Sequence, residues 1–207
     1  MKKYIVEAIG SFIFILTICC VVLGKVALAP LAIGSALMVM VYAGGHISGG
    51  HFNPAVTLAV WVRGKVNTAD VPWYMLAQVI GGILAGLVSM FLTGSIGAPA
   101  VINVGPALVA EFIFTFALCY VVLHTATADD TAGNSYYGLA IGFTVLIGAF
   151  AVGGISGGMF NPAVAIGVSV ARAAAWPNIW IYLLADFAGG AAAGFAFNYL
   201  NSGAKSE

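Results

Sequence analysis

A ten-residue segment built around Asn-Pro-Ala occurs twice in the chain, at residues 47–56 and 155–164. Nine of the ten positions are identical, and the two asparagines, Asn53 and Asn161, lie 161 − 53 = 108 residues apart. Asn followed by Pro is a strong helix start, because Asn caps free N–H groups of the first turn and Pro lacks an N–H that would have no partner there. Each segment is therefore predicted to begin a helix with its asparagine amide at the N-terminal end.

The chemistry of these two helix starts suits neutral polar molecules. A helix N-terminus carries a partial positive charge of about half an elementary charge, and an asparagine amide adds hydrogen-bond donors. If the two N-termini meet, cations and hydronium are disfavoured there, whereas a neutral hydrogen-bonding molecule is accepted. The predicted central constriction consists of Asn53, Pro54, Ala55, Asn161, Pro162 and Ala163.

Composition decides which elements can position these residues. Of the 207 residues, 62 % are hydrophobic and 7 % are charged, against about 25 % charged in average soluble domains. This number of charged residues is too small to cover the surface of a water-soluble protein. Much of the molecular surface must therefore be in contact with lipid. Seven basic and seven acidic residues give a formal net charge of zero, which argues against a nucleic-acid partner.

Six mostly uncharged stretches are long enough to cross a bilayer, which takes about 20 apolar residues. They are predicted at residues 4–23, 27–43, 72–93, 107–124, 136–152 and 178–200. Two shorter helices begin near Asn53 and Asn161 and end near Arg63 and Arg172. At about ten residues, or ~15 Å, each covers half of a ~30 Å hydrocarbon core and cannot cross alone. The predicted fold class is an all-α membrane protein with six transmembrane helices and two re-entrant half-helices.

The duplication extends beyond the Asn-Pro-Ala segments. The offset of 108 also aligns Gly81 with Gly189, and an offset of 104 aligns Glu7 with Glu111. Because each copy holds three spans, an odd number, the second copy enters the membrane from the opposite face and the repeat is inverted. We predict one domain over residues 1–207, with repeats 1–96 and 107–200 and a linker at 97–106.

Glycine-rich stretches lead into both asparagines, at residues 44–50 and 153–158. We expect irregular backbone along these stretches, which membrane proteins tolerate only where it is buried in protein or lines a water-filled cavity. Broken helices at equivalent places of two inverted halves indicate a site at the membrane midplane. The free carbonyl groups of these stretches are then available to a polar solute.

With six spans, both termini lie on one side of the membrane. That side would hold five of the seven basic residues, namely Lys2, Lys3, Arg63, Lys65 and Lys205. Cytoplasmic flanks of membrane spans carry an excess of Lys and Arg. Both termini are therefore predicted to be cytoplasmic, in a multi-pass protein of the cell membrane.

Three acidic residues fall inside predicted spans, where charges are expensive and usually face the bundle interior. We expect the carboxylates of Glu7 and Glu111 to accept backbone N–H groups of the re-entrant loops, although Glu7 has the alternative of an interfacial place near Lys3. Asp186 occupies the place of Gln78 in the other half. It is either a buried acceptor that braces a loop or a protonatable group.

Two histidines, His46 and His51, lie in the first glycine-rich stretch. Without a third ligand nearby, hydrogen bonding within the loop is favoured over a metal pair or a pH switch. The sequence has no metal-ligand spacing and no nucleophile–base pair, so it predicts neither an enzyme nor a cofactor.

Taken over essentially the whole chain, the six spans, the duplicated Asn-Pro-Ala boxes and the paired glutamates resemble the major intrinsic protein family, the aquaporins and aquaglyceroporins. The resemblance implies a passive channel in the lipid bilayer for water or small neutral solutes. It also implies a homotetramer with one pore per subunit.

One departure from the family concerns its second, outer constriction. The family usually has an Arg three residues after the second Asn, where this chain has Val164, and an aromatic residue where it has Ile33. Gly158 precedes the second Asn by three residues, and the fifth span contributes Gly148 or Ala149. The resemblance then implies a wide and apolar outer filter, which admits solutes of the glycerol class.

Two other functions stay open from the sequence. Inverted repeats and broken helices also serve ion-coupled secondary transporters, whose flux follows a proton or sodium gradient. The remaining alternative is a structural membrane protein with a closed pore, which would fold well and conduct nothing.

Overall fold

The computed structural model describes residues 1–202, so Lys205 lies outside the described residues. Within them the chain forms eight α-helices, three short 3₁₀ turns and no strand. Six helices are long: α1 (Lys2–Leu23), α2 (Ala29–Ser48), α4 (Val71–Thr93), α5 (Val104–Ala126), α6 (Tyr137–Ser156) and α8 (Ile179–Asn201). Two are short: α3 (Pro54–Val62) and α7 (Pro162–Val170). The 3₁₀ turns are η1 (Thr68–Asp70), η2 (Asp129–Thr131) and η3 (Trp176–Asn178).

Six helices have the length and apolar composition needed to cross a membrane. The other two, α3 and α7, have only nine residues each. At 1.5 Å per residue the short helices reach roughly 14 Å, well short of the hydrocarbon thickness. The predicted fold class, with six spanning helices and two half-helices, is confirmed.

The glycine-rich stretches are less irregular than the sequence predicts. Helix α2 continues through Gly44 and Gly45 to Ser48, five residues past its predicted end, and α6 continues to Ser156, four residues past its predicted end. Each glycine inside a helix costs about 1 kcal/mol relative to alanine. Each backbone group left unpaired in lipid costs several kcal/mol. Helix therefore persists until Gly49 and Gly157, whose φ angles of +90° and +97° end it in the left-handed conformation.

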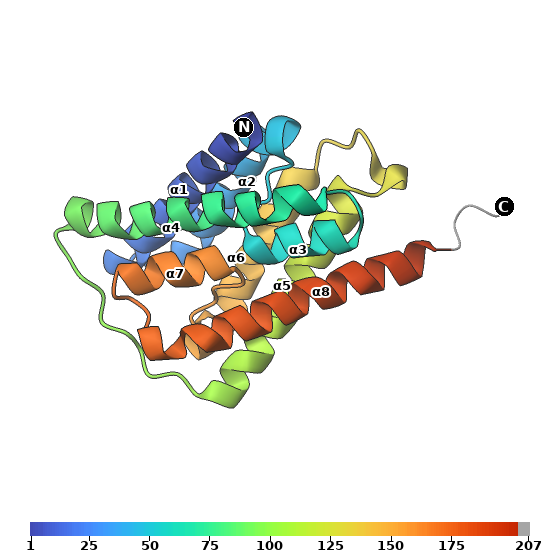
Figure 1. Cartoon of the computed structure of the whole chain (residues 1–207). Helices are drawn as coiled ribbons and strands as arrows, with labels where there is room; N and C mark the ends of the chain where they lie inside the picture. The colour runs from blue at the N-terminus through green and yellow to red at the C-terminus, as the bar shows by residue number, and fades with distance from the viewer. Residues whose placement is uncertain (203–207) are drawn as a thin grey trace.

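The helices pack as two matching sets. In the first half α1 lies against α4, and in the second half α5 lies against α8, while α2 and α6 pack together between the halves. Each half-helix packs mainly on a long helix of the other half, α3 on α8 and α7 on α4. Figure 1 shows α3 and α7 lying between α4 and α8. The two halves are thus interlocked.

Two glycines allow this interlocking because they bring backbones together. A Cβ atom on Gly82 of α4 would lie 2.6 Å from the carbonyl oxygen of Ala163, and one on Gly190 of α8 would lie 2.5 Å from that of Ala55. Small residues at helix interfaces let backbones approach closely in membranes. These contacts fix the first turns of α7 and α3, which carry the asparagines.

Gly190→Ala should destabilise the protein, because the added methyl group meets a backbone atom that cannot rotate away. The expected loss is about 1–3 kcal/mol, seen as a lower melting temperature in detergent. Gly154→Ala is the matched control, since no heavy atom lies within 4 Å of its added Cβ and alanine favours the helix. Equal melting temperatures for the two variants would contradict this account.

Candidate functional site

The loop between α2 and α3 is held by Glu7 of α1. Its Oε1 accepts hydrogen bonds from Ser48 Oγ at 2.7 Å and from the backbone N–H of His51 at 3.0 Å. Its Oε2 accepts from the backbone N–H of Phe52 at 2.7 Å and from Gln78 Nε2 at 2.8 Å. One fully buried carboxylate therefore satisfies two loop N–H groups and two side chains.

The alternative of an interfacial place for Glu7 beside Lys3 is wrong. Glu7 is buried, and the Lys3 ammonium pairs instead with Asp70 Oδ2 at 2.6 Å. That ion pair ties the start of α1 to the 3₁₀ turn before α4, where both side chains are partly exposed. The carboxylate of Glu7 is left to the loop alone.

Glu111 of α5 holds the loop between α6 and α7 in the same way. Its Oε1 accepts from Ser156 Oγ at 2.6 Å and from the backbone N–H of Met159 at 3.0 Å. Its Oε2 accepts from the backbone N–H of Phe160 at 2.7 Å. The two loops are therefore anchored by equivalent carboxylates from the first helix of each half.

The residue before each asparagine has a strained backbone. Phe52 and Phe160 have φ angles of 48° and 50°, in the left-handed region that costs a side-chain-bearing residue about 1–2 kcal/mol. Each N–H is bonded to a glutamate, and each carbonyl accepts a hydrogen bond from the opposite half. Asn161 Nδ2 donates to the Phe52 carbonyl, and Asn53 Nδ2 donates to the Phe160 carbonyl, both at 2.9 Å.

Each asparagine thus has two structural tasks. Asn53 Oδ1 accepts from the backbone N–H of Ala55 at 2.8 Å, and Asn161 Oδ1 accepts from those of Ala163 at 2.9 Å and Val164 at 3.4 Å. Each Oδ1 caps its own half-helix, while one N–H of each Nδ2 bridges to the other loop. An amide nitrogen has two hydrogens, so one donor per asparagine is left for a molecule between the loops.

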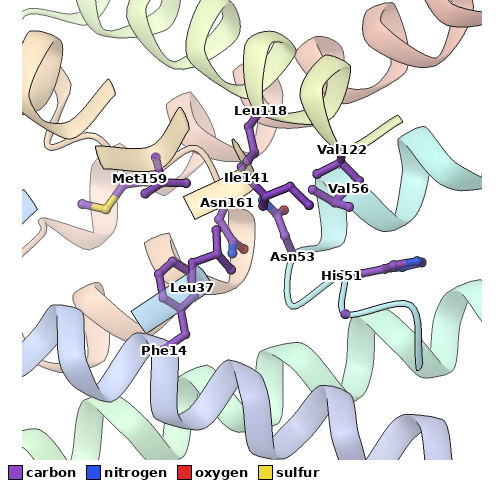
Figure 2. A pocket seen from close by; sticks show the side chains of 12 residues that line it. Phe14, Leu37, His51, Asn53, Val56, Leu118, Val122, Ile141, Met159 and Asn161 are labelled. Carbon is purple, nitrogen blue, oxygen red and sulfur yellow. The ribbon is translucent and has the colours of Figure 1, made fainter. Parts of the chain in front are cut away.

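A narrow cavity lies beside the two asparagines (Figure 2). Figure 2 shows Asn53 and Asn161 near its centre, with His51 on one side and Met159 on the other. The rest of the wall is mostly aliphatic and aromatic: Phe14, Leu37, Val56, Leu118, Val122, Ile141 and Val145. The space open to water is about 10 Å³, which is about the room that one water molecule needs. At this level the cavity therefore has room for about one water molecule at a time.

The two histidines have different places. His51 is buried on the cavity wall, with its Nδ1 3.1 Å from Thr57 Oγ1. His46 is exposed, and its side chain forms no hydrogen bond with any residue from 1 to 202. The predicted bracing role of His46 is wrong because α2 extends to Ser48, which keeps His46 on the last helical turn. There it lines a separate cavity, together with residues 125–129 and 131–134.

Two of the predicted outer-filter residues lie on the same helix faces as residues that line the cavity. Ile33 lies four residues before Leu37 on α2, and Ala149 lies four residues after Val145 on α6. Residues four apart share a helix face. Because α2 and α6 run in opposite directions, both faces extend toward the mouth that lies away from the ends of the chain.

The surroundings of Gly148 differ from those of the other filter candidates. A Cβ on Gly158 would lie 3.5 Å from the Cα of Ala149, so these two residues are neighbours, and Val164 is 1 % exposed on the first turn of α7. Gly148 is covered by two aromatic rings, since a Cβ there would lie 2.7 Å from the ring of Phe160 and 2.8 Å from that of Phe114. Of the two fifth-span candidates, the structure favours Ala149 and excludes Gly148.

The sequence gives no sign of the apolar cavity wall on α1, α2, α5 and α6. Leu118 and Val122, and likewise Ile141 and Val145, are spaced by four, which is one helix face. The faces turned to lipid are equally apolar, with Phe112, Phe143 and Ile147 exposed on the same helices. A helix that is apolar all round offers no contrast from which the pore-facing side could be predicted.

Two opposed half-helices, crossed asparagine bridges and a narrow cavity between six spanning helices define a membrane channel. No group of His, Cys, Asp and Glu within residues 1–202 has the arrangement of a metal site. The chain belongs to the major intrinsic protein family, whose model matches residues 1–197. Members of this family are passive channels, not enzymes.

Known relatives agree with this assignment. Aquaporin NIP1-1 of Oryza sativa subsp. japonica is 38 % identical over 213 residues, which cover 97 % of this chain and 74 % of the relative. Glycerol uptake facilitator protein-like 6 of Lactiplantibacillus plantarum is 34 % identical over 215 residues, covering 98 % and 99 %. The X-ray structure of the aquaglyceroporin from Plasmodium falciparum superposes with a TM-score of 0.71 over 97 % of this chain and 96 % of that one. At 19 % identity, that likeness shows the fold alone.

Glu111→Gln should impair folding more than selectivity. Glutamine has one side-chain oxygen and an NH₂ group in place of the second oxygen, so it cannot accept all the hydrogen bonds that Glu111 accepts. At least one buried N–H group is left without an acceptor, at a cost of about 1–3 kcal/mol. We expect a lower yield and melting temperature, with ion exclusion intact in the channels that assemble. Asp130→Asn, at an exposed acid, is the control. Normal assembly combined with ion leakage would contradict the bracing role.

Asn161→Asp should weaken the exclusion of cations. The carboxylate still accepts the capping N–H groups, but it loses the donor to Phe52 and puts a negative charge where two helix N-termini meet. Asn161→Ser, which keeps a capping oxygen without a charge, is the matched control. Proton flux into vesicles under an imposed pH gradient should rise several-fold for the aspartate alone. Equal leakage for both variants would count against an electrostatic barrier.

Proposed function

We propose that this protein conducts water in single file and also admits small neutral solutes of the glycerol class. The observation that carries the proposal is the central cavity, whose polar side consists of two asparagine amides at opposed helix N-termini. Each amide keeps one free donor for a passing oxygen atom, while the two partial positive charges repel cations.

The aliphatic side chains that line the same cavity support passage of solutes with both a hydroxyl and a hydrocarbon face. Such a solute can turn its hydroxyl groups to the asparagines and its carbon atoms to Leu37, Leu118 and Ile141. The free-energy cost of removing water from the solute is then offset by hydrogen bonds to its hydroxyl groups and by apolar contacts with its carbon atoms. Because the resting cavity holds about one water molecule, these side chains must move slightly to admit glycerol.

For the outer filter we propose Ile33, Ala149, Gly158 and Val164. In place of the aromatic residue and the arginine that many family members have there, these side chains are small or aliphatic. Such a filter is wider and lacks one positive charge, so discrimination against solutes larger than water is reduced. Proton exclusion then depends mainly on the asparagine pair.

An ion-coupled transporter is the weaker candidate. Coupling requires an ionisable or cation-binding group at the substrate site. Among residues 1–202, His51 is the one ionisable side chain that lines the central cavity, and its Nδ1 is engaged by Thr57 Oγ1; no Asp, Glu, Lys or Arg lines it. Glu7 and Glu111 are buried behind the loops, where their oxygens are engaged by donors.

The assembly and orientation follow from the same proposal. We propose that the channel is one domain made of two inverted repeats, that it assembles as a homotetramer with one pore per subunit, and that it lies in the cell membrane. Lys2, Lys3, Arg63 and Lys65 lie at the ends of helices that share the face where α1 begins and α8 ends, which supports cytoplasmic termini.

Val164→Arg should reduce glycerol permeability much more than water permeability, because it adds bulk and a positive charge one turn from Asn161. Stopped-flow light scattering of proteoliposomes with water, glycerol, urea and ammonia measures both. Val164→Leu adds bulk without charge and should have a smaller effect.

Three outcomes of the same assay would overturn parts of this proposal. A wild-type channel that passes water and excludes the three solutes would contradict the wide filter alone. Solute flux that follows a proton or sodium gradient would favour a coupled transporter. A well-folded protein that conducts nothing would favour the closed structural alternative.

A further inference from the structure

The polar groups behind the two re-entrant loops differ most at Asp186. Asp186 of α8 lies 186 − 78 = 108 residues after Gln78 of α4, and both side chains are fully buried. In the first half Gln78 Nε2 donates a hydrogen bond to Glu7 Oε2 at 2.8 Å. In the second half Asp186 accepts a hydrogen bond from Thr115 Oγ1 at 3.0 Å, one turn of α5 from Glu111, so its side chain lies against the helix face that carries Glu111. An amide donor in one half is thus replaced by a carboxyl group in the other.

An ionised Asp186 could not replace the glutamine, because a carboxylate only accepts hydrogen bonds. Glu111 already accepts one hydroxyl and two backbone N–H groups, which identifies it as the ionised member of the pair. A second ionised carboxylate beside it, inside a bilayer, would add like-charge repulsion to the loss of solvation. One proton shared by the two groups removes both costs.

The two oxygens of Asp186 indicate where that proton lies. Oδ1 accepts from Thr115 Oγ1 at 3.0 Å. Oδ2 is buried and has no hydrogen-bond donor among residues 1–202; the backbone N–H of Asn161 lies near the carboxyl group without forming a bond of normal geometry to it. We propose that Asp186 is a neutral carboxylic acid, protonated on Oδ2, that donates a hydrogen bond to Glu111 and so positions the second re-entrant loop.

A second difference between the halves explains why an acid fits here better than an amide. The two hydrogens of Gln78 Nε2 both have partners, Glu7 Oε2 and, at 2.9 Å, Thr57 Oγ1. The counterpart of Thr57, at 57 + 108 = 165, is Ala165, which has no acceptor oxygen in its side chain. An amide at position 186 would therefore keep one N–H unpaired in a buried site, which destabilises the folded state. A carboxylic acid has one hydrogen, and Glu111 accepts it.

Asp186 acts on the pore through Glu111. The Glu111 carboxylate fixes the N–H of Phe160, and the Phe160 carbonyl in turn receives the bridge from Asn53. Without the donor from Asp186, Glu111 Oε2 keeps one hydrogen bond where its counterpart in Glu7 has two. The expected result is a looser second loop and a less sharply defined central constriction.

Infrared spectroscopy of the reconstituted wild-type channel at neutral pH tests the protonation directly, because a protonated carboxyl group absorbs apart from an ionised one. We expect one protonated band, absent from Asp186→Asn and unchanged in the control Asp130→Asn. Carbon-13 labelling of aspartate carboxyl groups should shift the band, and labelling of glutamate should not. No band, a band that survives in Asp186→Asn, or a shift that follows the glutamate label would overturn the proposal.

Two further variants test the positioning role. Asp186→Val, similar in shape but without a donor, should lower water permeability per assembled channel several-fold and lower the melting temperature. Asp186→Asn should recover part of both losses, and adding Ala165→Thr should recover more by giving the second N–H an acceptor. If Asp186→Asn is no better than Asp186→Val, the donor has no role. The spectrum does not depend on which solute is conducted, so a missing flux with an intact band would contradict only the proposed function.

Discussion

The structure depends on two buried carboxylates that satisfy backbone N–H groups where no water can. A re-entrant loop at the membrane midplane exposes N–H groups whose desolvation costs several kcal/mol each. Glu7 and Glu111 each accept two of these groups together with the hydroxyl of the serine that ends the preceding helix. Charge-assisted bonds to several donors offset the cost of burying the carboxylates themselves. The strained backbone before each asparagine persists because its N–H is fixed in this way.

Anchoring the loops leads directly to the crossed bridges at the centre. With Phe52 and Phe160 fixed, their carbonyls lie where the asparagine of the opposite half can donate to them. The bridge requires close approach of the half-helices to the long helices of the opposite half, and Gly82 and Gly190 provide it. Each half therefore supplies the packing surface and one hydrogen-bond partner for the other half. Neither half could form the constriction alone, which explains why the ten-residue segment is nearly identical in both copies.

Much of this arrangement could be predicted from the sequence, because duplicated features have strong physical signatures. Two Asn-Pro starts, charges inside apolar spans and helices too short to cross a bilayer left few alternatives, so the spans and the half-helices were predictable. Other features depend on tertiary contacts that the sequence does not encode locally. His46 is on a helix because α2 continues through two glycines. Gly148 is excluded from the filter by the ring of Phe160. The cavity wall is as apolar as the lipid-facing surface, so no pattern distinguishes the two.

Corresponding helices of the two halves are nearly equal in length, whereas the polar side chains behind the loops differ between the halves. In the first half His51, Thr57 and Gln78 form a network in which one amide serves two acceptors. In the second half Met159 and Ala165 have no such side-chain oxygen or nitrogen. The proposed rejection of cations depends on both helix N-termini and both asparagines at the constriction, and these are the parts that the halves share. The loop and the serine before it present three donors to each glutamate, so the residue behind the loop need only add a fourth. An amide with two acceptors or an acid with one can do so. The side chains that differ between the halves therefore lie behind the loops, where a difference leaves the helix N-termini and the asparagines of the pore unchanged.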